Sequence, residues 1–72
     1  MEYVRVVYPT ARPVYIDGAA SGATNAVLRL DAGTHVFDLG VPADYEPVSQ
    51  QVTVQGTTVL TPKAITFTQR GG

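Results

Sequence analysis

The chain has 72 residues, of which 44% are hydrophobic and 15% are charged, and its formal net charge is −1. This composition is too apolar for a disordered segment, and the length suits one small domain, residues 1–72. The arginines form no basic run, which argues against nucleic-acid partners. Cysteine is absent, which argues against disulfides and thiolate metal sites. No stretch approaches the roughly 20 apolar residues of a membrane span, so no spanning segment is expected.

Two short strands are predicted near the start of the chain. Residues 3–8 alternate and are rich in β-branched and aromatic side chains, and Pro9 ends this first strand. Residues 14–16 form the second strand, and the dipeptide Asp17-Gly18 after them suits a tight turn because both residues tolerate a positive φ. Residues 19–24 are small and polar and are predicted to be a loop.

A hairpin is predicted over residues 26–39. Leu28 and Leu30 share one parity, and after a turn at residues 31–33 the side chains of His35, Phe37 and Leu39 share another, as in strands with one face on a core. Residues 40–47 contain two prolines and are predicted to be a connecting loop.

A second hairpin is predicted in the C-terminal third. Val52 and Val54 lie in phase, and a turn at Gln55-Gly56 leads into residues 57–60. Pro62 cannot donate a ladder hydrogen bond, so the last strand is expected to resume over residues 64–68. Residues 69–72 are expected to be a disordered tail.

These elements predict an all-β fold. No long window shows helical spacing without glycine or proline, and turn signals recur throughout the chain. The expected architecture is a small antiparallel β-sandwich of about six or seven short strands.

Several short motifs, in order, resemble the PEGA domain family. Residues 9–18 resemble its opening, although only the proline of the family's tetrapeptide is kept, and residues 22–25 stand where the family has Gly-x-Thr-Pro. The pattern Leu-x-Leu-x-Ala-Gly-x-His over residues 28–35, the dipeptide at residues 44–45 and the strand at residues 52–54 follow at the expected distances. The resemblance covers about residues 4–67. It implies an all-β module without established catalytic activity, often part of bacterial envelope, surface-layer or signalling proteins.

The residue inventory predicts no catalytic site, no cofactor and no metal site. His35 is the sole histidine and hence the obvious general base. Its phase with Phe37 and Leu39 instead predicts a packing role, because the nearest acid in sequence, Asp38, points to the other face of the strand. The two serines, Ser21 and Ser49, lie in no nucleophile motif.

Two tyrosines are the candidate binding residues. Tyr15 is predicted to face outward because Val14 and Ile16 take the core parity. Tyr45 follows the long loop and is interpreted either as part of a binding surface or as an anchor of that loop.

The sequence therefore favours a non-catalytic interaction or spacer module of a bacterial envelope or surface-associated protein. One alternative is a glycan or cell-wall binding module that uses Tyr15 and Tyr45. Another is a ubiquitin-like modifier, suggested by the ending Arg70-Gly71-Gly72, which would need a helix packed across the sheet. The start of the sequence does not have the pattern of a secretory signal peptide, so we expect a cytoplasmic protein or a segment of a longer exported chain. Neither the partner nor the oligomeric state follows from these patterns.

Overall fold

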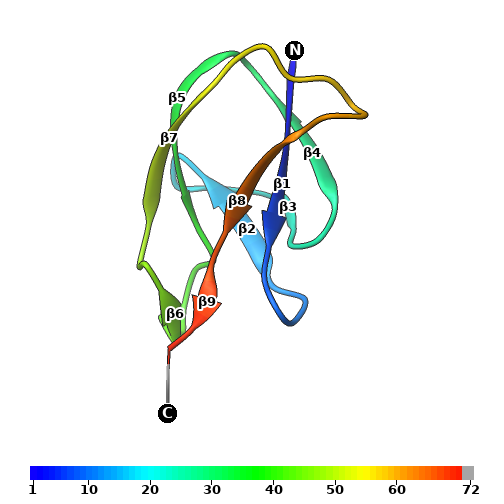
Figure 1. Cartoon of the computed structure of the whole chain (residues 1–72). Coiled ribbons are helices and arrows are strands. Elements are labelled where there is room, and N and C mark those ends of the chain that lie inside the picture. Colours follow the sequence, from blue (N-terminus) through cyan, green and yellow to red (C-terminus); the bar gives the residue numbers. More distant parts are fainter. Residues whose placement is uncertain (71–72) are drawn as a thin grey trace.

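The computed structural model describes residues 1–70 and is a β-sandwich with nine strands and no helix in this part of the chain (Figure 1). The strands are β1 (Glu2–Val7), β2 (Pro13–Ile16), β3 (Ala19–Ala23), β4 (Val27–Leu30), β5 (Gly33–Asp38), β6 (Tyr45–Glu46), β7 (Gln50–Val54), β8 (Lys63–Thr66) and β9 (Thr68–Gln69). The predicted all-β sandwich is confirmed, with three strands that were not expected: β3 and the two-residue strands β6 and β9.

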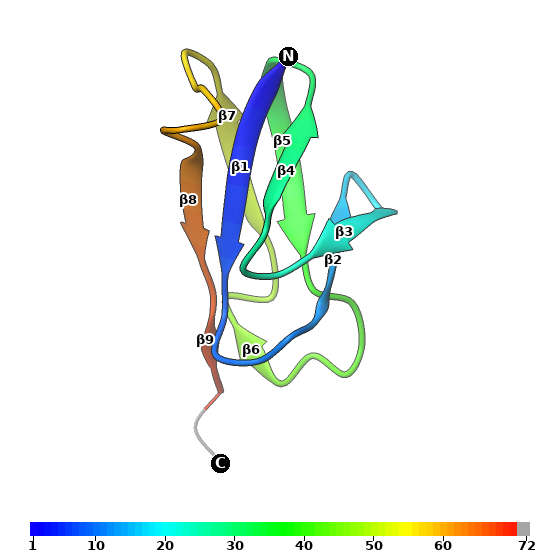
Figure 2. The same cartoon turned by 90° about the vertical axis from the view of Figure 1, so that its right-hand side faces the viewer.

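The strands form two facing sheets and one small ribbon. One sheet has the order β4-β1-β8, the other has the order β3-β2-β5-β7, and β6 pairs with β9. Figures 1 and 2 show the β6–β9 ribbon at the end of the sandwich where the described chain finishes. The pairings are antiparallel except that of β1 with β8, which is parallel.

The core follows the alternation of the sequence. On β1, Val4 and Val6 are completely buried while Arg5 and Val7 are exposed. The other fully buried side chains come from the β3-β2-β5-β7 sheet and from the segments beside the ribbon: Val14, Phe37 and Val54 in the sheet, and Leu39 and, at 1% exposure, Phe67 beside the ribbon. Burial of one face of each sheet against the other is the main source of stability in such a layered fold.

The segment predicted to be the first loop is instead strand β3. The turn at Asp17-Gly18 is confirmed, with φ of 53° and 84°, and it joins β2 to β3 in a hairpin. Alanine, serine and glycine carry no alternating apolar signal, and all five β3 residues are exposed, so the strand owes its position to backbone pairing with β2.

Both hairpins predicted downstream are wrong. Strand β4 pairs with β1, whereas β5 pairs with β2 and β7, so residues 31–32 cross from one sheet to the other. Strand β7 pairs with β5, and residues 57–60 lie outside the strands. Alternation determines which face of a strand is buried but not which strand becomes its neighbour.

The segment after β7 is instead a turn with an apolar tip. Thr57 is held by the backbone N–H of Tyr3 (2.7 Å) and by a carboxylate oxygen of Glu2, which accepts from the Thr57 N–H (2.8 Å). Beyond it, Val59 and Leu60 are 58% and 88% exposed. Thr57, the first residue of the strand predicted after the turn, is therefore bonded to the start of β1.

The ordered part of the chain extends beyond the predicted end. The predicted last strand divides at Phe67 into β8 and β9, and Gln69 lies in β9. The Arg70 N–H donates to the carbonyl of Asp44 (2.9 Å). The expected tail is thus wrong for residues 69–70, while residues 71–72 lie outside the described part. The loop predicted over residues 40–47 contains β6, which pairs with β9.

Candidate functional site

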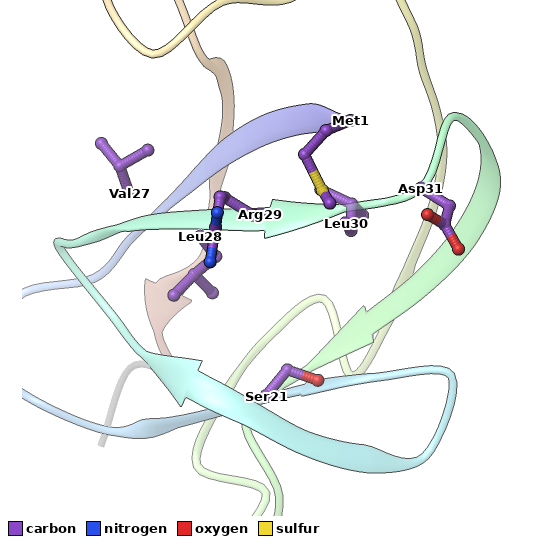
Figure 3. Close-up of a pocket in the computed structure, with 7 residues that line it drawn as sticks. All are labelled: Met1, Ser21, Val27, Leu28, Arg29, Leu30 and Asp31. Carbon is purple, nitrogen blue, oxygen red and sulfur yellow. The ribbon is translucent and has the colours of Figure 1, made fainter.

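An open groove lies between β3 and β4, the edge strands of the two sheets on one side of the sandwich (Figures 2 and 3). It has a volume of about 520 Å³ and is lined by Met1, Ser21, Val27, Leu28, Arg29, Leu30 and Asp31. Leu28 points from β4 toward β3, and Val27 points away from it (Figure 3). The groove therefore combines an apolar floor with a polar rim.

The small residues of β3 keep this groove open. A Cβ added at Gly22 would lie 2.3 Å from Cδ2 of Leu28, so glycine allows the leucine side chain to rest against the β3 backbone. No large side chain of β3 fills the remaining space, and Leu28 stays half-buried.

His35 fastens together the two chain segments that lead to the groove. Its Nδ1 lies 2.6 Å from Oδ2 of Asp17, in the β2–β3 turn, and its Nε2 lies 2.8 Å from the carbonyl oxygen of Asp31, at the end of β4. The Asp17 carboxylate also accepts from the Val36 N–H (2.9 Å). Because both acceptors lack protons, an imidazolium satisfies both contacts and a neutral ring satisfies only one.

These contacts shift the pKa values of both His35 and Asp17. The hydrogen bond to Asp17, followed by that to the Asp31 carbonyl, raises the pKa of His35 against the opposing effect of burial. The contact with His35, followed by the Val36 N–H, lowers the pKa of Asp17. The prediction that His35 lies in phase with Phe37 is confirmed, since the two rings pack edge to face with centroids 6.4 Å apart. The expectation that His35 faces no acid is wrong, because Asp17 reaches its ring from the β2–β3 turn.

Tyr45 is a loop anchor and not part of an exposed surface. Its side chain is 2% exposed, its ring packs edge to face on Tyr8 and Phe67, and its hydroxyl donates to the Gly40 carbonyl (2.8 Å) and accepts from the Leu39 N–H (3.1 Å). Of the two roles considered for this residue, the geometry supports the anchor.

Tyr15 lies apart from Tyr45, on the outer face of β2, and is half-buried. Its ring covers Gly40, where an added Cβ would lie 2.6 Å from Cε1 of Tyr15. Gly40 thus separates the two rings, with φ of 73° that glycine tolerates best. The structure does not gather the two predicted tyrosines into one surface.

Arg12 is an anchoring residue that the sequence did not reveal. Its guanidinium pairs with Asp44 (2.5 Å), donates to the Pro42 carbonyl (2.8 Å) and lies 5.3 Å from the centre of the Tyr45 ring. The hydrogen bond to Asp44 raises the pKa of Arg12, and the same contact lowers the pKa of Asp44. The sequence shows only an arginine before Pro13, and its half-buried position against aromatic rings is known from the structure alone.

Arg5 and Arg29 were also missed, because they are distant in sequence. Arg5 is opposite Val27 and Tyr3 is opposite Arg29 in the β1–β4 register, so the two arginines are diagonal neighbours on the outer face. Both are exposed, and neither joins an ion pair within residues 1–70. Strand parity together with the β1–β4 register would have revealed this pair.

Other chemistry is limited in the described residues. Among residues 1–70, no three histidine, cysteine, aspartate or glutamate side chains are grouped so that they could hold a metal ion. The same part of the chain contains no helix with the length and apolar character to cross a membrane.

Comparison with known proteins relates the chain to one family. The family model described as the PEGA domain matches residues 4–69. No curated protein and no solved structure gives a significant match.

Proposed function

Because the chain belongs to the PEGA domain family, we propose that it is a single non-catalytic interaction domain that binds a partner in the groove between β3 and β4. PEGA domains are generally non-catalytic modules and are often extracellular or surface-associated. In line with this, the proposed setting is a bacterial envelope or surface-associated protein, where the domain also acts as a spacer.

The observation that carries this proposal is the open groove itself. A small domain buries little surface, so covering the half-buried Leu28 beside a polar rim with a partner would add to its stability. Ser21, Arg29 and Asp31 at the rim supply the few polar groups that orient a ligand over an apolar floor.

A photo-crosslinking amino acid placed at Ser21, in the producing cells, tests this proposal. We expect covalent attachment of one discrete partner at this position. Thr53 is the matched control, because it is an exposed polar residue on β7, away from the groove lining. Equal attachment at both positions, or none at Ser21, would overturn the proposal.

A glycan or cell-wall ligand remains the second candidate function, favoured by the partly exposed ring of Tyr15. The burial of Tyr45 leaves Tyr15 as the aromatic residue of this surface. Soluble peptidoglycan fragments should then shift the NMR signals around Tyr15 rather than those around Ser21. The ubiquitin-like alternative loses its support, since residues 1–70 contain no helix to pack across a sheet.

A further inference from the structure

The direction of the β1 backbone determines which groups of β4 are free. The Tyr3 N–H donates to Thr57, and the Val7 carbonyl accepts from the Phe67 N–H (2.9 Å), so both residues turn their peptide groups toward the β8 side. Peptide groups alternate sides along a strand. Glu2, Val4 and Val6 therefore turn theirs toward β4.

The same alternation applies to β4. Val4 is paired with Leu28 and Glu2 with Leu30, so these are the hydrogen-bonded pairs of the ladder. The N–H and C=O groups of Val27 and Arg29 consequently point away from β1, along the free edge of the sheet. No turn, loop or side-chain hydrogen bond within residues 1–70 uses these groups.

The other sheet edges are protected against added strands. Pro62 precedes β8, and Lys63 shares the parity of buried Ile65, an inward position that discourages pairing. Gln50 on β7 donates its side-chain amide to the Thr66 carbonyl (2.7 Å). The register of β3 with β2 is interrupted by a bulge. Strand β4 has no proline, no bulge and no inward charge.

The two faces of β4 differ in chemistry. Leu28 and Leu30 lie on the groove side. The outer face of the sheet carries no acidic residue, and its members are Tyr3, Arg5, Val7, Val27, Arg29, Ala64 and Thr66. Asp31 follows the last residue of β4, and its carbonyl is bonded to His35.

We propose that β4 binds an extended segment of a partner protein, which adds a strand to the sheet and carries acidic side chains beside Arg5 and Arg29. An apolar side chain of that segment covers the half-buried Leu28 in the groove. This proposal rests on the proposed function and identifies its partner. A second copy of the chain fits poorly, because two β4 edges would bring Arg29 close to its own counterpart.

Synthetic peptides that alternate valine with glutamate, lysine or serine test this inference on the purified chain. By NMR we expect the glutamate peptide to protect the Val27 and Arg29 amides from hydrogen exchange. It should bind about tenfold more tightly than the lysine peptide, since two arginines face its acidic positions. Arg29→Glu should reverse that preference, whereas Arg70→Glu, at the opposite end, should not.

A second variant tests the edge directly. In Val27→Pro the lost N–H is one that points away from β1, so the sheet can form while strand addition is blocked. Unchanged peptide binding by this variant, or binding without protection of the Val27 and Arg29 amides, would overturn strand addition. Failure of every peptide while crosslinking at Ser21 persists would overturn this inference alone.

An anionic polysaccharide provides the remaining comparison. If heparin shifts the Arg5 and Arg29 signals and no glutamate peptide binds, the arginine face recognises anionic glycan and the protein-strand proposal is wrong. Weak or absent heparin binding beside protection by the glutamate peptide supports it.

Discussion

Two regions of the sandwich differ in how completely their polar groups are bonded. One is the Arg12–Tyr45 region beside the β6–β9 ribbon, and the other is the β3–β4 side. In the first region nearly every polar group is used, with Arg12, Asp44 and the Tyr45 hydroxyl all bonded around buried rings. In the second, Leu28 is half-covered and β4 keeps a free edge. In this domain the side-chain hydrogen bonds around buried rings gather in one region, and the other region is less covered.

Tyr45→Ala should produce the largest loss of stability, because it removes the central ring of the Arg12–Tyr45 region. Removal of a buried aromatic ring costs about 3–5 kcal/mol in the free energy of unfolding. Tyr45→Phe is the matched control and should cost about 1–2 kcal/mol, because the Leu39 N–H loses its acceptor. Denaturant melts measure both; a near-neutral alanine variant would show that the ring is not an anchor.

Arg12→Met should have the next largest effect. Methionine keeps much of the packing volume but removes the charged donor to the Leu39 and Pro42 carbonyls, a loss of about 1–3 kcal/mol. Arg70→Met removes a more exposed pair with Glu46 and should cost less than about 1 kcal/mol. Equal effects of the two variants in denaturant melts would contradict the anchoring role of the Arg12 guanidinium.

Tyr15→Ala should destabilise less than Tyr45→Ala and Arg12→Met, by about 1 kcal/mol, because its ring is half-exposed and covers Gly40 from one side only. The outward position predicted from the sequence implies almost no loss of stability, and the contact with Gly40 raises the expected loss slightly. A loss as large as that of Tyr45→Ala would mean that the tyrosine on β2 also anchors the loop.

The pH dependence at His35 should be the smallest effect. The pKa of His35 is raised in the folded state, so its contribution is present below the unfolded pKa of about 6.5 and is lost as pH rises through the folded value. The pKa of Asp17 is lowered, so its contribution is present above the unfolded value and is lost as pH falls through the folded one.

The two contributions coexist between about pH 4 and pH 6.5, where this contact should stabilise the fold slightly, because solvent screens the half-exposed Asp17. Thermal melts across pH measure the effect. Asp17→Asn should flatten the decline above pH 6.5, and an unaltered decline in that variant would assign it to another group.

The sequence could predict burial but not neighbours. Alternation correctly identified the buried side of β1 and of Phe37, and Asp17-Gly18 correctly indicated a tight turn. Strand β3 carried no signal, because alanine and glycine hold their place by backbone pairing alone.

Contacts between distant segments were equally invisible in the sequence. The Arg12–Asp44 pair joins residues 32 apart, and the His35–Asp17 pair joins residues 18 apart. Each depends on which strands become adjacent, and that arrangement is decided by packing of the two sheets. The tyrosines could be recognised as candidates, but only the packed structure separates the anchor from the exposed ring.

The parallel pairing of β1 with β8 has a mechanical consequence. The two strands run side by side in register from Val4↔Lys63 to Val7↔Thr66, with the start of β1 and the end of β8 at opposite ends of the sandwich (Figures 1 and 2). Tension applied between these two ends acts along the strands, so it loads the hydrogen bonds between them together in shear. The same pairing that closes the sheet therefore suits the domain to carry tension along a chain.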